Sequence, residues 1–171
     1  MGKTKHITAP LGARTIAGLE AGEMVSLSGT IYTARDQAHL RLSKLISSGK
    51  KLPVDIKGQI FYYCGPTPAP PDKPIGSCGP TTSGRMDAFT PAVLGAGLKG
   101  MIGKGRRSEK VRESVKKNKA VYFLAPAGAG AYLNAKVTSC KVVAFEELGP
   151  EAIYRLEVKD FPLIVGIDAR G

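Results

Sequence analysis

Apolar and polar side chains recur along the chain with the periods of strands and short helices. Residues 24–28 alternate between apolar and polar side chains and residues 30–33 continue a β-rich run, so we predict one strand with Gly29 as a bulge. Apolar or β-branched runs predict five further strands, at residues 59–64, 101–103, 121–125, 142–145 and 163–167. Prolines and glycines interrupt residues 1–22, where we expect an irregular segment.

Several segments between these strands have the features of helices. Apolar residues at helical spacing predict a helix over about residues 36–48, with Thr33 or the pair Arg35-Asp36 at its start and a glycine directly after it. A second helix is expected to begin at Thr90-Pro91, because proline is favoured in the first helical turn, and to end at Gly100.

A third helix is predicted from Ser108 through about Lys119. Serine is a good N-cap, and the acidic-to-basic order of the charges suits the helix dipole. A short helix is expected at residues 131–135. Strands that alternate with short helices, without an internal repeat, are typical of a layered α/β fold, and we predict that residues 1–171 form one such domain.

The stretch Cys78–Asp87, with the sequence CGPTTSGRMD, concentrates groups that bind small anions. Its proline and glycines shape the backbone, so we expect a defined loop after the proline-rich segment 65–71. The three hydroxyls of residues 81–83 can donate or accept hydrogen bonds, and Arg85 has a planar fork that fits a carboxylate or phosphate. The alternative is a surface turn whose hydroxyls cap the following helix.

Two more basic residues follow predicted strands. Arg35 stands at the start of the helix over residues 36–48, where the positive end of the helix dipole would assist in holding an anion. The alternative for Arg35 is a solvated surface arginine. Lys104 is flanked by glycines, which let a ligand approach the backbone. For His39, one helical turn after Arg35, a structural hydrogen bond is the favoured interpretation.

The chain is strongly basic, which favours an anionic partner. It has 171 residues with 25 Lys and Arg against 14 Asp and Glu, a net charge of +11. Nucleic acid, an anionic metabolite and an acidic protein all satisfy this charge. The segment Lys104–Lys119 holds eight basic and two acidic residues, but few stacking groups accompany it and the chain has no Trp. A solvated helix face or a field that steers an anion is therefore the preferred interpretation of this segment.

The cysteines do not form a ligand pattern. Cys64, Cys78 and Cys140 are widely spaced with no CxxC pair, so we predict no metal or iron–sulfur site in this chain. An odd number of cysteines and no signal peptide indicate a reducing compartment, and we expect a cytoplasmic protein. No apolar run reaches the roughly 18 residues that cross a bilayer, so we expect no membrane partner.

Three motifs in a fixed order connect these residues to a known family. The motifs Thr33-Ala-Arg-Asp-x-Ala-His39, Gly79-Pro-Thr-Thr-Ser-Gly-Arg-Met-Asp87 and Gly103-Lys-Gly-x-Arg107 resemble those of the β subunit of two-subunit class I fumarate hydratases. The resemblance covers about residues 5–170, and in single-chain relatives this unit is the C-terminal domain. The β subunit of L(+)-tartrate dehydratase is similar in the same motifs.

The resemblance implies a swivelling β/β/α domain whose active site is completed by an α subunit that holds a 4Fe-4S cluster. Several residues of this chain fall on functional positions of the family. The substrate-binding positions are matched by Arg35, Arg85 and Lys104. The catalytic positions are matched by Thr81, the proposed base, and again by Lys104. Secondary candidates in the same motifs are Thr82, His39 and Asp87.

The implied activity is the reversible hydration of fumarate to L-malate, a step of the tricarboxylic acid cycle. The resemblance further implies a hetero-oligomer such as α2β2 that is active only with its α subunit. The residues agree with a dicarboxylate substrate, because two guanidinium groups and one ammonium match its charge. A tartrate dehydratase β subunit is the first alternative. A non-catalytic basic module that binds nucleic acid is the second, although we expect no nucleic-acid partner.

Overall fold

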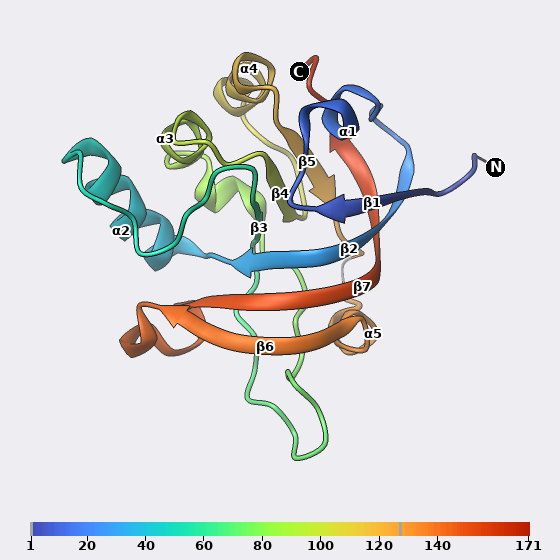
Figure 1. The fold of residues 1–171 in the computed structure, drawn as a ribbon, viewed down its shortest axis with the longest axis vertical. Coiled ribbons are helices and arrows are strands. Elements are labelled where there is room, and N and C mark those ends of the chain that lie inside the picture. Colours follow the sequence, from blue (N-terminus) through green and yellow to red (C-terminus); the bar gives the residue numbers. More distant parts are fainter. Residues whose placement is uncertain (1, 127) are drawn as a thin grey trace.

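The protein combines one curved sheet with a layer of short helices (Figure 1). The computed structural model describes residues 2–126 and 128–171. The strands are β1 (Lys5–Ala9), β2 (Met24–Thr33), β3 (Ile60–Tyr62), β4 (Gly100–Gly103), β5 (Val121–Leu124), β6 (Val137–Ala144) and β7 (Ile153–Ile167). The helices are α1 (Ala13–Ala17), α2 (Asp36–Ser47), α3 (Thr90–Gly95), α4 (Glu109–Asn118) and α5 (Gly130–Asn134), with 3-10 turns η1 (Ser83–Met86) and η2 (Glu146–Glu151). In these ranges no helix is long and apolar enough to cross a membrane.

The sheet closes on itself through β7. Strands β1 to β5 are parallel neighbours in chain order, whereas β7 runs antiparallel and pairs with β5 on one side and with β2 on the other. Ile164 of β7 is in register with both Met24 of β2 and Leu124 of β5, so the ring β2–β3–β4–β5–β7 is complete. The predicted α/β mixture with short helices is confirmed. The sequence did not predict the closure, and the swivelling β/β/α arrangement stays a prediction.

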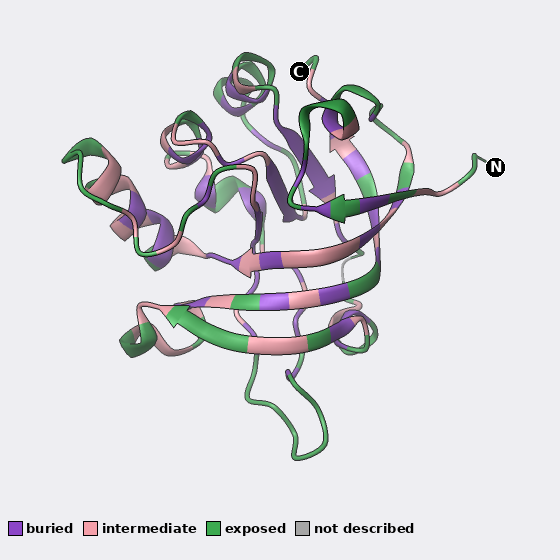
Figure 2. Cartoon of the chain, in the orientation of Figure 1, coloured by how far each residue is buried: buried purple, intermediate pink, exposed green. Residues whose placement is uncertain are grey.

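Buried side chains form two cores on the two faces of the ring. In β3, Ile60 and Tyr62 belong to the core inside the ring, whereas Phe61 and Tyr63, the residue that follows the strand, belong to the core beneath the helices. Neighbouring side chains of a strand point to opposite faces, so β3 is buried on both. Figure 2 shows the same two-sided burial along β4 and β5. A strand covered on both faces reads as a continuous apolar run, which is why these three strands were predicted correctly.

Helices α2, α3 and α4 lie side by side over one face of the sheet (Figure 1). Each contributes to the core beneath it, for example through Leu42, Val93 and Val115. The start of α4 is as predicted, since the Ser108 side chain accepts a hydrogen bond from the backbone N–H of Val111. Because β2, β3 and β4 are parallel, their carboxyl ends meet at one edge, and α2 begins directly beyond the end of β2.

The predicted irregular lead-in over residues 1–22 is wrong, because this segment contains β1 and α1. Both elements have only five residues, which is too short for a clear periodic pattern. In β1 only Ile7 and Ala9 are buried, and α1 buries only Ile16. Pairing with β2 and packing at distant positions, rather than local propensity, therefore hold these residues in place.

Three other predicted boundaries are also wrong. The helix that begins at Thr90 ends at Gly95 and not at Gly100, because Gly97 has a φ of +113° and Gly100 already belongs to β4. The strands predicted at 142–145 and 163–167 are the ends of longer strands, β6 and β7. The earlier parts of these strands contain polar and charged residues at exposed positions, so they do not show a clear apolar strand pattern in the sequence. In addition, Asp160 has a φ of +53°, which interrupts the regular backbone of β7.

Candidate active site

Three of the predicted site residues lie at the carboxyl ends of neighbouring parallel strands. Arg35 follows β2 and Lys104 follows β4. Thr81 is held at the end of β3, where its backbone N–H donates to the carbonyl of Tyr63 at 2.7 Å. The N–H of Ser83 donates to the carbonyl of Lys104 at 2.9 Å. Adjacent strands lie about 4.8 Å apart, so the ends of β2 and β4 are about 10 Å apart, and this edge is where α/β proteins bind ligands.

Arg35 lies in a space that Gly65 leaves open. It directly precedes α2, with an extended backbone at φ −113° and ψ −160°. A Cβ atom at position 65 would collide with Nη1 of Arg35 and lie 3.1 Å from its Cδ. The Nε atom of Arg35 is buried and has no hydrogen-bond partner among residues 2–126 and 128–171. Since an unpaired buried donor is unfavourable, Arg35 is suited to an acceptor from outside this part of the chain.

Arg85 forms a two-point ion pair with Asp36, the first residue of α2. Its Nε lies 3.1 Å from Oδ1 and its Nη2 lies 2.6 Å from Oδ2 of that carboxylate. The Arg85 side chain is 51% exposed, and exposed pairs contribute only about 0–1 kcal/mol. An incoming carboxylate can therefore replace Asp36, or bind the remaining nitrogen Nη1, at small cost.

The three neighbouring hydroxyl residues differ in their surroundings. Ser83 is buried, and its Oγ lies 2.8 Å from the hydroxyl of Tyr122. Thr81 is half-buried and Thr82 is exposed, while the backbone at Thr82 pairs with that at Lys104. The Ser83 hydroxyl is thus used within the fold, which leaves those of Thr81 and Thr82 as candidates for contact with a ligand.

Two of the secondary candidates, His39 and Asp87, bond inside the fold. The buried His39 ring has its Nδ1 2.8 Å from the carbonyl oxygen of Arg35, so Nδ1 carries the proton. The favoured structural hydrogen bond is therefore present, and burial lowers the pKa of His39 to about 4. The carboxylate of Asp87 accepts from Nε of Arg107 and from the backbone N–H of Ser108, each at 2.7 Å.

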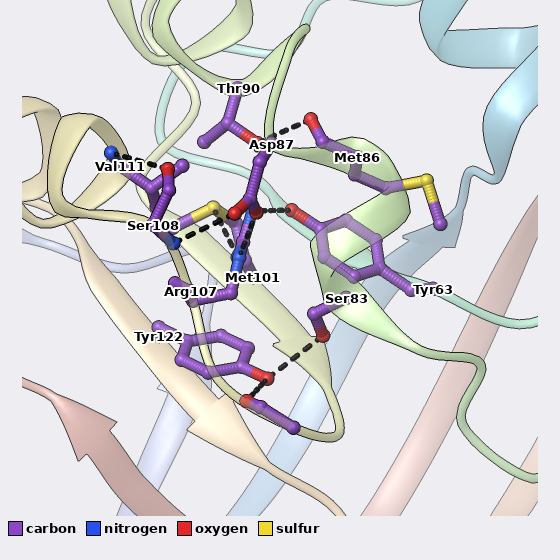
Figure 3. Close-up of polar contacts among 11 residues, drawn as sticks. Tyr63, Ser83, Met86, Asp87, Thr90, Met101, Arg107, Ser108, Val111 and Tyr122 are labelled. Carbon is purple, nitrogen blue, oxygen red and sulfur yellow. Dashed lines mark hydrogen bonds and ion pairs between the residues drawn. The ribbon is translucent and has the colours of Figure 1, made fainter.

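The sequence did not predict the buried polar side chains that pack beneath this site. Arg107 ends the third motif and was otherwise counted only with the solvated basic helix face, but its side chain is 0% exposed. Figure 3 shows its guanidinium among Asp87, Tyr63 and Tyr122. Tyr63 and Tyr122 could have indicated a buried polar partner, because the hydroxyl of a tyrosine in an apolar strand needs a hydrogen-bond partner. Since Arg107 is buried, the basic run is not one continuous exposed face.

The described residues offer cations and hydroxyls but no ligand set for a metal. Within residues 2–126 and 128–171 no group of three or more His, Cys, Asp or Glu side chains is placed to hold a metal ion. The hydrogen bond between the two thiols raises the pKa of Cys64 and lowers the pKa of Cys78, so it disfavours the presence of both as thiolates. These residues do not fit a 4Fe-4S cluster as ligands.

Known proteins similar to this chain are named as hydro-lyases. The chain is 41% identical over 149 residues to the class I, anaerobic fumarate hydratase of Escherichia coli K12, covering 86% of this chain and 27% of that protein. It is 37% identical over 167 residues to a Methanocaldococcus jannaschii protein with the provisional name L(+)-tartrate dehydratase subunit beta, covering 94% of this chain and 86% of that protein. The chain thus spans about a quarter of the fumarate hydratase but most of the second relative.

The similarity extends over nearly the whole chain. A Geobacillus stearothermophilus protein provisionally named class I fumarate hydratase is 33% identical over 170 residues, covering 96% of this chain and 32% of that protein. A family model described as Fumarase C-terminus matches residues 4–171. The relatives' names include two different substrates, so they do not choose between fumarate and tartrate. On this match the chain belongs to the Fumarase C-terminus family.

Proposed function

We propose that this chain is the β subunit of a two-subunit iron–sulfur hydro-lyase that reversibly hydrates fumarate to L-malate. The observation that carries the proposal is that Arg35, Thr81 and Lys104 stand at the carboxyl ends of the neighbouring strands β2, β3 and β4. The chain covers 86% of a relative provisionally named a subunit beta, and on that match we assign the rest of the site to an α subunit. The assembly would be a cytoplasmic hetero-oligomer such as α2β2, acting in the tricarboxylic acid cycle.

The cations of this chain would hold and orient the two carboxylates of the substrate. Arg35 and Arg85 have forks that match carboxylates, and Lys104 adds a point charge. Each hydrogen bond to a charged group contributes about 1.5–3 kcal/mol, which is enough to fix the orientation. Removing a proton beside a carboxylate builds negative charge on it, so the same cations would stabilise the transition state more than the substrate.

The electrophile that assists the departing hydroxyl would come from the partner. A 4Fe-4S cluster on the α subunit would supply Lewis-acid chemistry, and the described residues of this chain do not fit it as ligands. This chain would provide the base. A threonine hydroxyl is a poor base, so Thr81 would depend on nearby cations that favour its ionised form.

The role of Thr81 can be tested by removing or keeping its hydroxyl. Thr81→Ala is expected to lower kcat about 10²-fold with little change in KM, because a general base acts in the transition state. Thr81→Ser keeps the hydroxyl and is expected to keep most of the activity. Steady-state kinetics of both variants with the α subunit check this. A loss confined to KM would leave Thr81 as a binding residue only, and a larger loss in Thr82→Ala would assign the role to Thr82.

Tartrate is the alternative substrate, and one relative favours it. The M. jannaschii protein, of which this chain covers 86%, bears the provisional name of a tartrate dehydratase subunit. Tartrate is also a dicarboxylate from which water can be removed, so the three cations fit both substrates. Comparing kcat/KM for malate and L(+)-tartrate in the same complex would separate the two assignments.

The proposed function is tested by anaerobic assay of this chain alone and mixed with a cluster-loaded α subunit. Loss of fumarate absorbance is expected only in the mixture, and Arg85→Ala is expected to lower the activity by about tenfold or more because a charged hydrogen bond is lost. Activity of this chain alone would show that it contains its own electrophile. An inactive mixture with a confirmed cluster would contradict fumarate hydration and make tartrate the next substrate to assay.

A further inference from the structure

Arg107 is a buried arginine at the centre of a polar network behind the candidate site (Figure 3). Its Nε donates to Oδ1 of Asp87 at 2.7 Å. Its Nη2 lies 2.8 Å from Oγ1 of Thr90 and 3.3 Å from the hydroxyl of Tyr63. The guanidinium lies over the rings of Tyr63 and Tyr122, 5.3 and 4.8 Å from their centroids. One side chain therefore connects the end of β3, the loop after η1, the start of α3 and strand β5.

Two of these contacts lead directly to candidate site residues. Tyr63 provides the carbonyl that accepts from the backbone N–H of Thr81 at 2.7 Å. Asp87 is the residue directly after η1, the short turn that carries Arg85. Arg107 therefore holds the supports of both Thr81 and Arg85.

Tyr122 extends the network to the segment of Lys104. Its hydroxyl lies 2.9 Å from the carbonyl oxygen of Gly105 and 2.8 Å from Oγ of Ser83. A phenol has one proton and a carbonyl can only accept, so Tyr122 donates to Gly105 and accepts from Ser83. The backbone N–H of Ser83 in turn donates to the carbonyl of Lys104 at 2.9 Å. These bonds join residues 81–83, the loop of the candidate base Thr81, to the segment of Lys104 and Gly105.

The contact between the two loops is closely packed. A Cβ atom at Gly103 would collide with Oγ of Ser83 and lie 2.9 Å from Cδ2 of Tyr63. Ser83 and Tyr63 are both buried. Because these side chains are closely packed, a substitution of Arg107 or Tyr122 is expected to shift the backbone of residues 81–85 and 103–105.

We propose that Arg107 is a positioning residue that fixes residues 81–85 against Lys104. The inference rests on the proposed function, because it identifies a support of that same site. Arg107 has no exposed side-chain surface, so it acts through its neighbours and not on substrate. Precise support matters because a misplacement of about 1 Å can lower a rate about 10²-fold. Lysine cannot replace this support, since it lacks the planar fork that bonds several partners at once.

The catalytic part of the test compares variants in the assembled complex. Arg107→Lys is expected to lower kcat per folded molecule about 10²-fold. Tyr122→Phe keeps the ring under the guanidinium and removes only the hydroxyl link, and is expected to lower kcat about tenfold with a small change in Tm. Arg112→Lys, at an exposed position of α4, is the matched control and is expected to stay within about twofold of the unmodified complex.

A second readout uses this chain alone and does not depend on activity. Hydrogen exchange of single amides by NMR reports the bonds of Thr81 to Tyr63 and of Ser83 to Lys104. In Arg107→Lys these two amides are expected to exchange at least about tenfold faster. The amide of Leu11, which donates to Gly58 in another part of the fold, is the internal reference and is expected to keep its rate.

The outcomes separate the inference from the proposed function. Faster exchange at Thr81 and Ser83 with a loss of kcat per folded molecule supports the positioning role. Equal acceleration of all three amides, or kcat per folded molecule unchanged in Arg107→Lys, shows a purely structural arginine and overturns the inference alone. A cluster-loaded, unmodified complex that converts neither malate nor tartrate overturns the proposed function, and with it a positioning role in that reaction.

Discussion

Arg35→Lys is expected to lower kcat/KM for the dicarboxylate about 10- to 150-fold while changing the free energy of unfolding little. The lysine keeps the charge but loses the second of two parallel bonds to a carboxylate, and one hydrogen bond to a charged group is worth about 1.5–3 kcal/mol. The stability changes little because Nε of Arg35 has no partner within the described ranges that the change would remove. Gly65 shapes the space around a guanidinium, so the ammonium would not be held in the same way. Steady-state kinetics and thermal unfolding measure the two effects.

Arg41→Lys is the matched control for this prediction. Arg41 lies on the same helix, α2, but pairs with Glu147, whose side chain is 63% exposed, and lies over the ring of Phe145. Its change to lysine is expected to leave kcat/KM within about twofold, because exposed pairs contribute little. If Arg35→Lys behaved like Arg41→Lys, substrate carboxylate binding would have to be assigned to Arg85 and Lys104.

The sequence predicted those elements whose signals are local. The three short strands β3, β4 and β5 are buried on both faces and appear as continuous apolar runs. Helix α4 begins at its predicted cap, Ser108, and α2 spans nearly the predicted residues. For the same reason the shaped loop before η1 was predicted from its own proline and glycines.

Features set by distant pairing could not be predicted from the residues alone. The ring closes because Leu27 of β2 pairs with Phe161 of β7, more than a hundred residues away, and local periodicity carries no information on that register. The burial of Arg107 and its contacts were missed for a similar reason. Arg107 stands in a run of basic residues, and only the fold brings Asp87, Tyr63 and Tyr122 around it.

The candidate site was predicted in two unequal parts. The residue types of Arg35, Arg85 and the hydroxyl loop (residues 81–83) predicted an anion site and left the identity of the anion open. Only the resemblance supplied a dicarboxylate and an iron–sulfur partner. The structure separates the candidates into two groups. Arg35, Thr81 and Lys104 lie at one edge of the sheet. His39 and Asp87 instead form hydrogen bonds with other residues of the fold.

His39 is expected to make the protein less stable in mild acid. Burial, assisted by the charge of Arg107, lowers the pKa of His39 to about 4 from an ordinary value near 6.5, although the bond to the Arg35 carbonyl and the charge of Asp36 act in the opposite direction. Below pH 6.5 the unfolded chain takes up a proton at this residue and the folded chain does not. Stability from the neutral ring is therefore full above pH 6.5 and is lost as the pH falls towards 4. Between pH 7 and pH 5 the free energy of unfolding should fall by about 2 kcal/mol from this residue.

The measurement is denaturant unfolding at pH 7 and pH 5 of the unmodified chain and of His39→Asn. Asparagine places an N–H near the position of Nδ1, so the bond to the Arg35 carbonyl can persist while the titration disappears. The smaller side chain lowers stability at both pH values, and this cost cancels in the difference between them. Between pH 7 and pH 5 the free energy of unfolding of the variant is expected to fall by about 2 kcal/mol less than that of the unmodified chain.

His6→Asn, at an exposed position of β1, is the control for replacing any histidine, and its free energy of unfolding is expected to fall as much as that of the unmodified chain. An equal fall in stability for the unmodified chain and His39→Asn would show that His39 is protonated in the folded protein, and that its ring is not enclosed as the core beneath α2 requires.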